Sequence, residues 1–182
     1  MKTQLNNEIE LIQHYGIRTL VKRTLALAPE CFWTMPASTS GKHHPEISLG
    51  EGGLIRHTKA VVKLTQMMLE TLELQPVQRD CAIAAAILHD CCKKADDEEH
   101  TAPDHPLRAA HLWIDNYFAD SGLIEFAVAT EVYLIIRSHM GRWNTSKHAP
   151  GLELPKPTST LERLVHTADY LASRKDITIA GI

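Results

Sequence analysis

The chain has 182 residues, a hydrophobic share of 44%, an aromatic share of 5% and a net charge of −3 with histidine neutral. This length suits one domain with a sizeable core, and few aromatic residues beside many Leu, Ile and Ala residues favour helices over a β-sandwich. The charge gives no support for a long polyanion-binding groove, while a local basic pocket for one or two phosphates is compatible with it. We therefore expect a single all-α domain over residues 1–182.

Eleven histidines are the unusual feature of the composition, and they suggest metal or phosphate chemistry. The four cysteines show no C-x-x-C spacing, and the adjacent pair Cys91 and Cys92 has poor geometry for a structural disulfide. A reducing compartment follows from this usage. The N-terminus lacks the apolar core of a secretion signal, and no apolar run reaches the roughly 18 residues of a membrane span. We expect a cytoplasmic protein without a membrane partner.

The first apolar stripe covers residues 9–28. It is interrupted near Gly16 and ended by Pro29, so we expect one bent helix or two short ones. Residues 29–53 contain repeated Pro and Gly and predict a loop of unusual length. Loops this long are more often functional than idle. This loop offers phosphate-compatible side chains at Lys42, His43 and His44.

Two helices are predicted next. Residues 54–74 contain neither Gly nor Pro and have helical apolar periodicity, with His57 in the first turn. Pro76 suits the first position of the following helix, whose small apolar residues lead into His89 and Asp90. An adjacent imidazole and carboxylate are ligands that divalent metals accept at hydrolytic sites. Alternatively, His89 only favours the negative end of the helix dipole.

The polar run of residues 93–104 predicts a solvated loop. Pro106 suits the first position of a helix that runs to about residue 118, which makes His105 its expected N-cap. An imidazole at the positive end of a helix stays neutral, as a metal ligand must be. We expect another helix over residues 123–140, with His139 near its end.

A loop rich in Gly and Pro is predicted after residue 140. The last helix is expected to start at Ser159, where a capping box with Glu162 is predicted, and to continue through Ala172 with Asp169 inside it. His57, His89, Asp90 and Asp169 thus come from three helices that could converge on one metal ion with an open position for water. The alternative is that Asp169 pairs with a surface arginine and His57 caps its helix, and the residues alone leave both interpretations open.

Five motifs follow one another in a fixed order, namely Gly-Gly-Leu-Ile-Arg-His57, Ile-Leu-His89-Asp90-x-x-Lys93, His105-Pro, His139 and Thr-Ala-Asp169-Tyr-Leu. This order resembles the HD-domain metal-dependent phosphohydrolase superfamily. The resemblance covers roughly residues 40–175, the expected HD core, and leaves residues 1–30 as an N-terminal helical segment. It implies a compact helical bundle with long active-site loops. It also implies that His57, His89, Asp90 and Asp169 bind a principal metal, and that His105 and His139 occupy the places of ligands to a second.

Two branches of the superfamily look similar. The stretch His105-Pro-Leu-Arg-Ala-Ala, together with Ala-Asp169-Tyr-Leu-Ala-Ser-Arg, looks like the bacterial symmetrical diadenosine tetraphosphate hydrolases. The Lys42-His43-His44 loop before the His57 helix is similar instead to the HD domain of bacterial 3′–5′ exoribonucleases. Those enzymes carry an additional nucleic-acid-binding domain, for which this length leaves no room.

We therefore expect an enzyme that cleaves a phosphoester or phosphoanhydride bond in a nucleotide or dinucleotide-like substrate, using water activated by one or two divalent ions of Fe, Mn, Co, Ni or Zn. Asp90 and Lys93 are the expected catalytic residues, with Lys93 balancing charge on phosphoryl oxygens. The expected substrate contacts are Lys42, His43, His44 and Arg142, and Trp143 either stacks on a base or packs in a core or lid. The alternatives are a nuclease for short single strands of RNA or DNA and a nucleotide sensor without turnover. The oligomeric state is left open.

Overall fold

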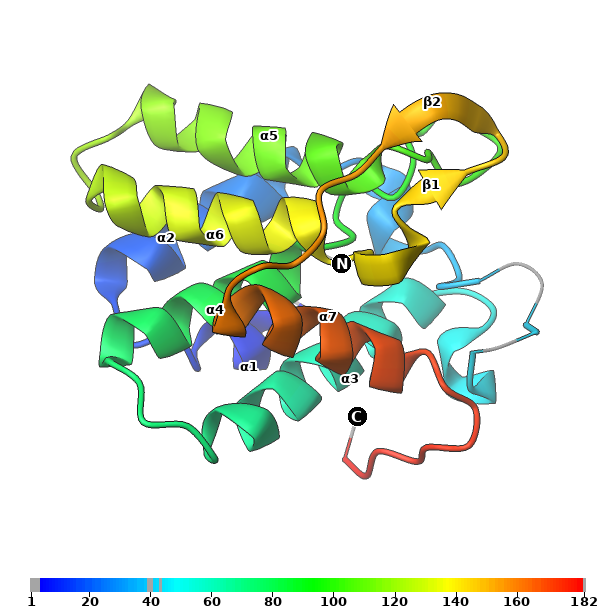
Figure 1. Ribbon diagram of the computed structural model, residues 1–182, viewed down its shortest axis with the longest axis horizontal. Coiled ribbons are helices and arrows are strands. Elements are labelled where there is room, and N and C mark those ends of the chain that lie inside the picture. The colour runs from blue at the N-terminus through cyan, green and yellow to red at the C-terminus, as the bar shows by residue number, and fades with distance from the viewer. Residues whose placement is uncertain (1–3, 39–40, 43, 182) are drawn as a thin grey trace.

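The structure, a computed structural model, describes residues 4–38, 41–42 and 44–181, and in this part of the chain it is a helical bundle with one small hairpin (Figure 1). The expectation of an all-α fold is confirmed. The seven helices are α1 (Asn6–Ile9), α2 (Tyr15–Leu27), α3 (Gly53–Leu69), α4 (Pro76–Leu88), α5 (His105–Ala119), α6 (Phe126–Ser138) and α7 (Thr160–Ala172). Three short 3-10 turns are η1 (Glu30–Trp33), η2 (Glu46–Ser48) and η3 (Gly141–Trp143).

Helix α4 is the centre of the bundle and contacts α1, α2, α3, α6 and α7. Every residue from Asp80 to Leu88 is buried. This explains why residues 81–88 of α4 are apolar on all sides, since a helix surrounded by others has no solvent face. Its run of alanines keeps the surface narrow, so neighbouring helices can approach it closely. The C-terminal end of α4, which carries the His-Asp motif, is therefore enclosed by the bundle.

The N-terminal segment forms two short helices rather than one bent helix, and the break lies before Gly16. Gly16 lies in the first turn of α2, where a Cβ atom would collide with the carbonyl oxygen of Leu123. It therefore permits a close approach between α2 and the segment that leads into α6. The break itself is fastened to α4, because the buried Asp80 carboxylate accepts hydrogen bonds from the backbone N–H groups of Gln13 (3.1 Å) and His14 (2.7 Å).

Helix starts with strong local signals lie where they were predicted. Pro76 is the first residue of α4. Ser159 caps α7 with both bonds of a capping box, as the backbone N–H of Glu162 donates to Ser159 Oγ at 3.2 Å and the backbone N–H of Ser159 donates to Glu162 Oε1 at 3.3 Å. Together these two bonds satisfy backbone donors that the helix itself cannot pair.

Other boundaries differ from the prediction. Helix α3 begins at Gly53, so His57 is its fifth residue and lies in the second turn, and α3 ends at Leu69 rather than at residue 74. His105 is the first residue of α5, and Asp104 takes the N-cap position. Helix α6 begins at Phe126, three residues later than expected. These shifts leave all the candidate ligands on the expected elements or directly after them.

The prediction of an irregular loop after residue 140 was incomplete, because this segment contains an antiparallel hairpin. Strand β1 (Thr145–Ser146) pairs with β2 (Ala149–Glu153), which includes Pro150 and Gly151. The base of the hairpin is closed by Asn144, whose side-chain amide donates to Glu153 Oε1 at 3.0 Å and to the carbonyl oxygen of Leu154 at 3.1 Å. In Figure 1 the hairpin stands at one end of the bundle, above η3.

Two further predictions concern the cysteines and the absence of a membrane span. Cys31, Cys81, Cys91 and Cys92 are free thiols, and the adjacent pair is buried with its Sγ atoms 3.8 Å apart. They pack as small hydrophobic side chains. Among the helices of the described residues, none is both long and apolar enough to cross a bilayer.

Candidate metal centre

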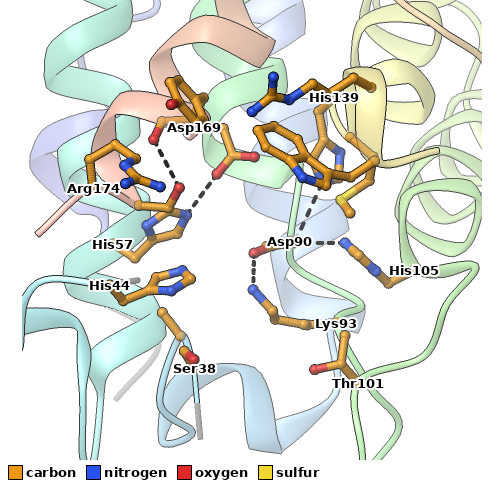
Figure 2. Close-up of a pocket in the computed structure, with 16 residues that line it drawn as sticks. Ser38, His44, His57, Asp90, Lys93, Thr101, His105, His139, Asp169 and Arg174 are labelled. Atoms are coloured by element: carbon orange, nitrogen blue, oxygen red, sulfur yellow. Dashed lines mark hydrogen bonds and ion pairs between the residues drawn. The ribbon is translucent and has the colours of Figure 1, made fainter. Parts of the chain in front are cut away.

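A cavity of about 520 Å³ opens at the C-terminal end of α4. Side chains reach it from α3, from the turn after α4, from the start of α5, from the end of α6 and from α7 (Figure 2). We call it the metal cavity, because five of the six candidate ligands line it and the sixth, His89, is buried next to Asp90 and Asp169. They form two groups, namely the first triad of His57, His89 and Asp169 and the second triad of Asp90, His105 and His139.

The ligand atoms within each triad lie within 4.8 Å of one another. In the first triad, Asp169 Oδ1 lies 3.0 Å from His57 Nε2 and 3.8 Å from His89 Nε2. The carboxylate of Asp169 thus faces two imidazoles rather than the surface arginine of the alternative interpretation. This arrangement offers one oxygen and two nitrogen atoms to a shared point.

The second triad is centred on Asp90. Its Oδ1 atom lies 3.1 Å from His105 Nε2 and 3.6 Å from His139 Nε2. Its other oxygen, Oδ2, lies 3.6 Å from His89 Nε2 in the first triad. Asp90 therefore stands between the two triads and presents one oxygen atom to each of them.

Three of the four imidazoles are oriented in the same way. The Nδ1–H group of His89 donates to the carbonyl oxygen of Ala86 at 2.9 Å, three residues earlier in the chain. His105 and His139 make the equivalent bonds, to Ala102 at 2.8 Å and to Ile136 at 2.8 Å. A carbonyl oxygen can only accept, so Nδ1 carries a proton in all three rings, which leaves Nε2 as the atom available to a metal. Such a bond fixes the tautomer and the ring orientation of a metal ligand.

The resulting arrangement fits a cation. With Nδ1–H donated to Ala102, the neutral form of His105 presents Nε2 as an acceptor, and this atom faces the acceptor Oδ1 of Asp90 at 3.1 Å. His89 Nε2 and Asp90 Oδ1 are buried and have no hydrogen-bond partner within the described residues. Buried acceptors that face one another are unfavourable unless a positive charge lies between them. Imidazole nitrogen with carboxylate oxygen is a donor set typical of Mn, Fe, Co, Ni and Zn sites.

Protonation states support the same interpretation. Burial lowers the pKa of His89 to about 4, so this imidazole is neutral near pH 7. Burial would raise the pKa of Asp90, but the nearby Lys93 ammonium, together with the neighbouring imidazoles, holds it well below its usual range. Burial would likewise raise the pKa of Asp169, but the contacts of this carboxylate with His57 and His89 lower that pKa below its usual value. Neutral imidazoles and ionised carboxylates are the states in which these groups bind metals.

Lys93 lies on the rim of the cavity next to the second triad. Its Nζ atom donates to Asp90 Oδ2 at 2.6 Å, and both side chains are largely buried. The lysine therefore orients the central carboxylate and also adds positive charge to the cavity. A phosphoryl oxygen entering the cavity would meet that charge.

Only some of the predicted substrate contacts lie in the wall of the metal cavity. His44 and Arg142 line the cavity, whereas Lys42 is exposed and is not part of its wall. His43 lies outside the described residues. The His44 ring lies 5.6 Å from the His57 ring, and burial, with some help from the charges of His57 and Lys93, lowers the pKa of His44 to about 4.

Several residues of the wall were not predicted from the sequence, among them Tyr170 and Arg174. The Trp143 ring stacks on Tyr170 with a centroid distance of 5.4 Å, and the Arg142 guanidinium lies 4.4 Å from the centre of the Trp143 ring. The Arg174 guanidinium lies 5.5 Å from the Tyr170 ring. Tyr170 directly follows Asp169 on α7, whereas Arg174 lies after the end of α7, where helical spacing gives no guidance.

A close contact between η3 and α7 fixes the turn that carries Arg142 and Trp143. The Nδ1–H group of His166 donates to the carbonyl oxygen of His139 at 2.6 Å. Gly141 has φ +57°, and a Cβ atom there would collide with the His166 ring. Only glycine satisfies both the left-handed conformation and the approach of the ring.

Substitution of Gly141 by alanine is therefore expected to lower the free energy of unfolding by roughly 2–4 kcal/mol, as backbone strain adds to the clash with the ring. Thermal and denaturant unfolding measure this effect. Gly122→Ala is a matched control, because open space surrounds Gly122 and its φ is not in the left-handed region. Adding His166→Ala should recover part of the loss by removing the clash. An unchanged stability of Gly141→Ala would contradict the packing described for this turn.

Comparisons with known proteins agree with this geometry. The family model for the HD domain matches residues 54–174, a range that contains all six candidate ligands. The chain is also similar to the dihydroneopterin 2′,3′-cyclic phosphate phosphodiesterase of Methanocaldococcus jannaschii, with 33% identity over 146 residues. That alignment covers 76% of this chain and 51% of the relative, so the chain spans about half the length of that protein. No solved structure matches the chain.

Proposed function

The chain belongs to the HD-domain family of metal-dependent phosphohydrolases, and from this membership we propose that it hydrolyses a phosphoester bond in a small nucleotide-like molecule. The observation that carries the proposal is the position of Asp90 between two triads of imidazole and carboxylate ligands, all of them buried except the half-buried Asp169. The relative from M. jannaschii is named for a cyclic phosphodiester, which supports a diester as the bond that is cleaved.

The two triads would hold two divalent ions. His57, His89, Asp90 and Asp169 would bind the principal ion, and Asp90, His105 and His139 would bind the second. A cation held in this way lowers the pKa of water and withdraws charge from phosphoryl oxygens. Asp90 would be a ligand in both sites, and Lys93 keeps Asp90 in place through their hydrogen bond.

The remaining wall residues would bind and orient the substrate. Lys93, Arg142 and Arg174 are the cationic side chains of the wall, and they would offset the negative charge of a phosphoester. His44 is neutral near pH 7, so it would act as a hydrogen-bond partner of the substrate without adding charge.

We expect substitution of His44 by alanine to lower kcat/KM by roughly 10- to 100-fold, the value of one hydrogen bond to a charged group. Metal content should stay unchanged, because His44 belongs to neither triad. Lys42→Ala should also leave metal content unchanged, and its effect on KM should be smaller because Lys42 is outside the cavity wall. Steady-state kinetics with metal analysis of each variant measures both quantities. Loss of metal from either variant would assign this loop to the coordination shell.

Turnover of bis-p-nitrophenyl phosphate with added Mn²⁺, Fe²⁺ or Co²⁺ tests the proposed activity. The monoester p-nitrophenyl phosphate, nucleoside 2′,3′-cyclic phosphates and short oligonucleotides define the bond and the size of the substrate. We expect diesters of small molecules to be cleaved faster than the monoester. Absence of turnover with every metal would favour a sensor, and preferential cleavage of oligonucleotides would favour a nuclease.

A further inference from the structure

A second chamber, of about 630 Å³, adjoins the metal cavity. It lies between the loop of residues 98–103 and the β1–β2 hairpin, and we call it the hairpin chamber. Thr101, His105, Met140 and Trp143 line both spaces. The two spaces therefore meet at a second-triad ligand and at the indole ring of Trp143. Each has a volume typical of a small-molecule site.

The walls of the hairpin chamber are suited to a flat apolar group. Pro103 comes from the loop, Leu152 from β2, Leu154 from the segment after the hairpin, and Met140 and Trp143 from the turn around η3. Leu154 is buried, while Trp143 keeps 44% of its surface exposed. A large aromatic ring that stays exposed beside a cavity offers apolar area that a ligand can cover.

The two spaces differ in charge. Three cationic side chains, Lys93, Arg142 and Arg174, line the metal cavity against two carboxylates, which bound divalent ions would more than neutralise. In the hairpin chamber, Glu98 and Glu99 stand against Arg108. Arg108 and Glu98 neutralise each other at 2.8 Å, and Arg108 also pairs with Asp104 at 2.9 Å, so Glu99 is the carboxylate of this wall that has no ion pair within the described residues. Phosphate is therefore favoured in the metal cavity and disfavoured in the hairpin chamber.

We propose that the hairpin chamber binds a planar heteroaromatic ring with amino or ring N–H donors, attached to the phosphoester that lies in the metal cavity. This inference rests on the proposed function and names its substrate class. The apolar walls would cover the faces of the ring, and the carboxylate of Glu99 would favour N–H donors at its edge. A second phosphate-rich group, as in a dinucleotide polyphosphate, would be repelled from this chamber.

Calorimetric binding to the metal-loaded protein tests this inference without hydrolysis. The probes are guanosine 5′-monophosphate and ribose 5-phosphate, which differ by the ring, and chromatography verifies that each stays intact. We expect the ring to tighten binding by roughly 10- to 100-fold, as stacking on protein side chains does for single bases. Equal affinities, or no binding of the guanosine compound, would overturn the proposal.

Two variants localise the ring. Leu152→Trp and Thr145→Trp each place bulk into the hairpin chamber, and each should reduce the affinity ratio of the two probes toward one. Thr145 is exposed on β1, so its replacement should not disturb folding. Lys147→Ala is the control, because Lys147 is exposed on the same hairpin and lies outside the chamber wall. An unchanged ratio in both tryptophan variants would place the ring elsewhere and overturn the proposal.

The two hypotheses fail separately. A ring preference without any turnover of bis-p-nitrophenyl phosphate would contradict the proposed hydrolysis and leave the hairpin chamber as a ring-binding site. Turnover of bis-p-nitrophenyl phosphate without a ring preference would overturn the ring-binding role of the hairpin chamber and leave the proposed hydrolysis in place.

Discussion

Substitution of Asp90 by alanine is expected to abolish nearly all hydrolysis, with a loss of kcat on the order of a thousandfold or more. Asp90 presents one oxygen atom to each triad, at 3.1 Å from His105 Nε2 and 3.6 Å from His89 Nε2. Its loss would therefore weaken both proposed ion sites together. It would also leave the Lys93 ammonium without its partner in a largely buried position.

Metal analysis and steady-state kinetics on the same preparation measure this prediction. Asp97→Ala is the control, since Asp97 is an exposed carboxylate in the loop that follows the site. Asp90→Asn keeps the size of the side chain and removes its charge, so it separates loss of charge from loss of packing. If Asp90→Ala had the metal content and turnover of the unmodified protein, the assignment of the metal site would be wrong.

Substitution of His105 or His139 by alanine is expected to lower the metal stoichiometry from about two toward one and to reduce kcat by about a hundredfold or more. Each residue supplies one Nε2 atom to the second triad and none to the first. The principal ion should therefore remain bound by His57, His89, Asp90 and Asp169. Loss of one ion would weaken the electrostatic stabilisation of the attacking and leaving oxygens.

Reconstitution with Mn²⁺ or Fe²⁺ under anaerobic conditions, followed by metal analysis, measures the stoichiometry. His111→Ala is a suitable control, because His111 is exposed on α5 and its ring contacts Tyr133 rather than the cavity. A saturating stoichiometry of one in the unmodified protein would indicate a mononuclear mechanism. His105 and His139 would then return to structural roles.

Helix starts were predictable where a few adjacent residues determine them. Pro76 and the pair Ser159 and Glu162 act through local sterics and local hydrogen bonds, which the sequence contains in full. The end of α3 was not predictable in this way. Leu72 and Leu74 stay packed against the core after the helix has ended at Leu69, so apolar periodicity alone extends the helix too far.

The candidate ligands could be found from the order of the motifs, because each lies in or directly after a helix whose position is well marked. The hairpin chamber could not. Its wall combines residues 98–103 with residues 140–154, two irregular segments that meet only through tertiary packing. No periodicity links them, and the hairpin between them has strands of two and five residues, too short for an alternating pattern.

The orientation of the three imidazoles has a consequence for how this site responds to mutation. The acceptors that hold His89, His105 and His139 are main-chain oxygens of Ala86, Ala102 and Ile136, each within the same turn as its histidine. Every amino acid carries such an oxygen, so no single substitution at these three positions can delete the acceptor. Where a side-chain carboxylate orients a histidine ligand instead, a single substitution of that Asp or Glu removes the hydrogen-bond acceptor. Random mutagenesis of this chain should therefore find inactivating changes at the ligands themselves and few at Ala86, Ala102 and Ile136, whose carbonyl oxygens orient the imidazoles.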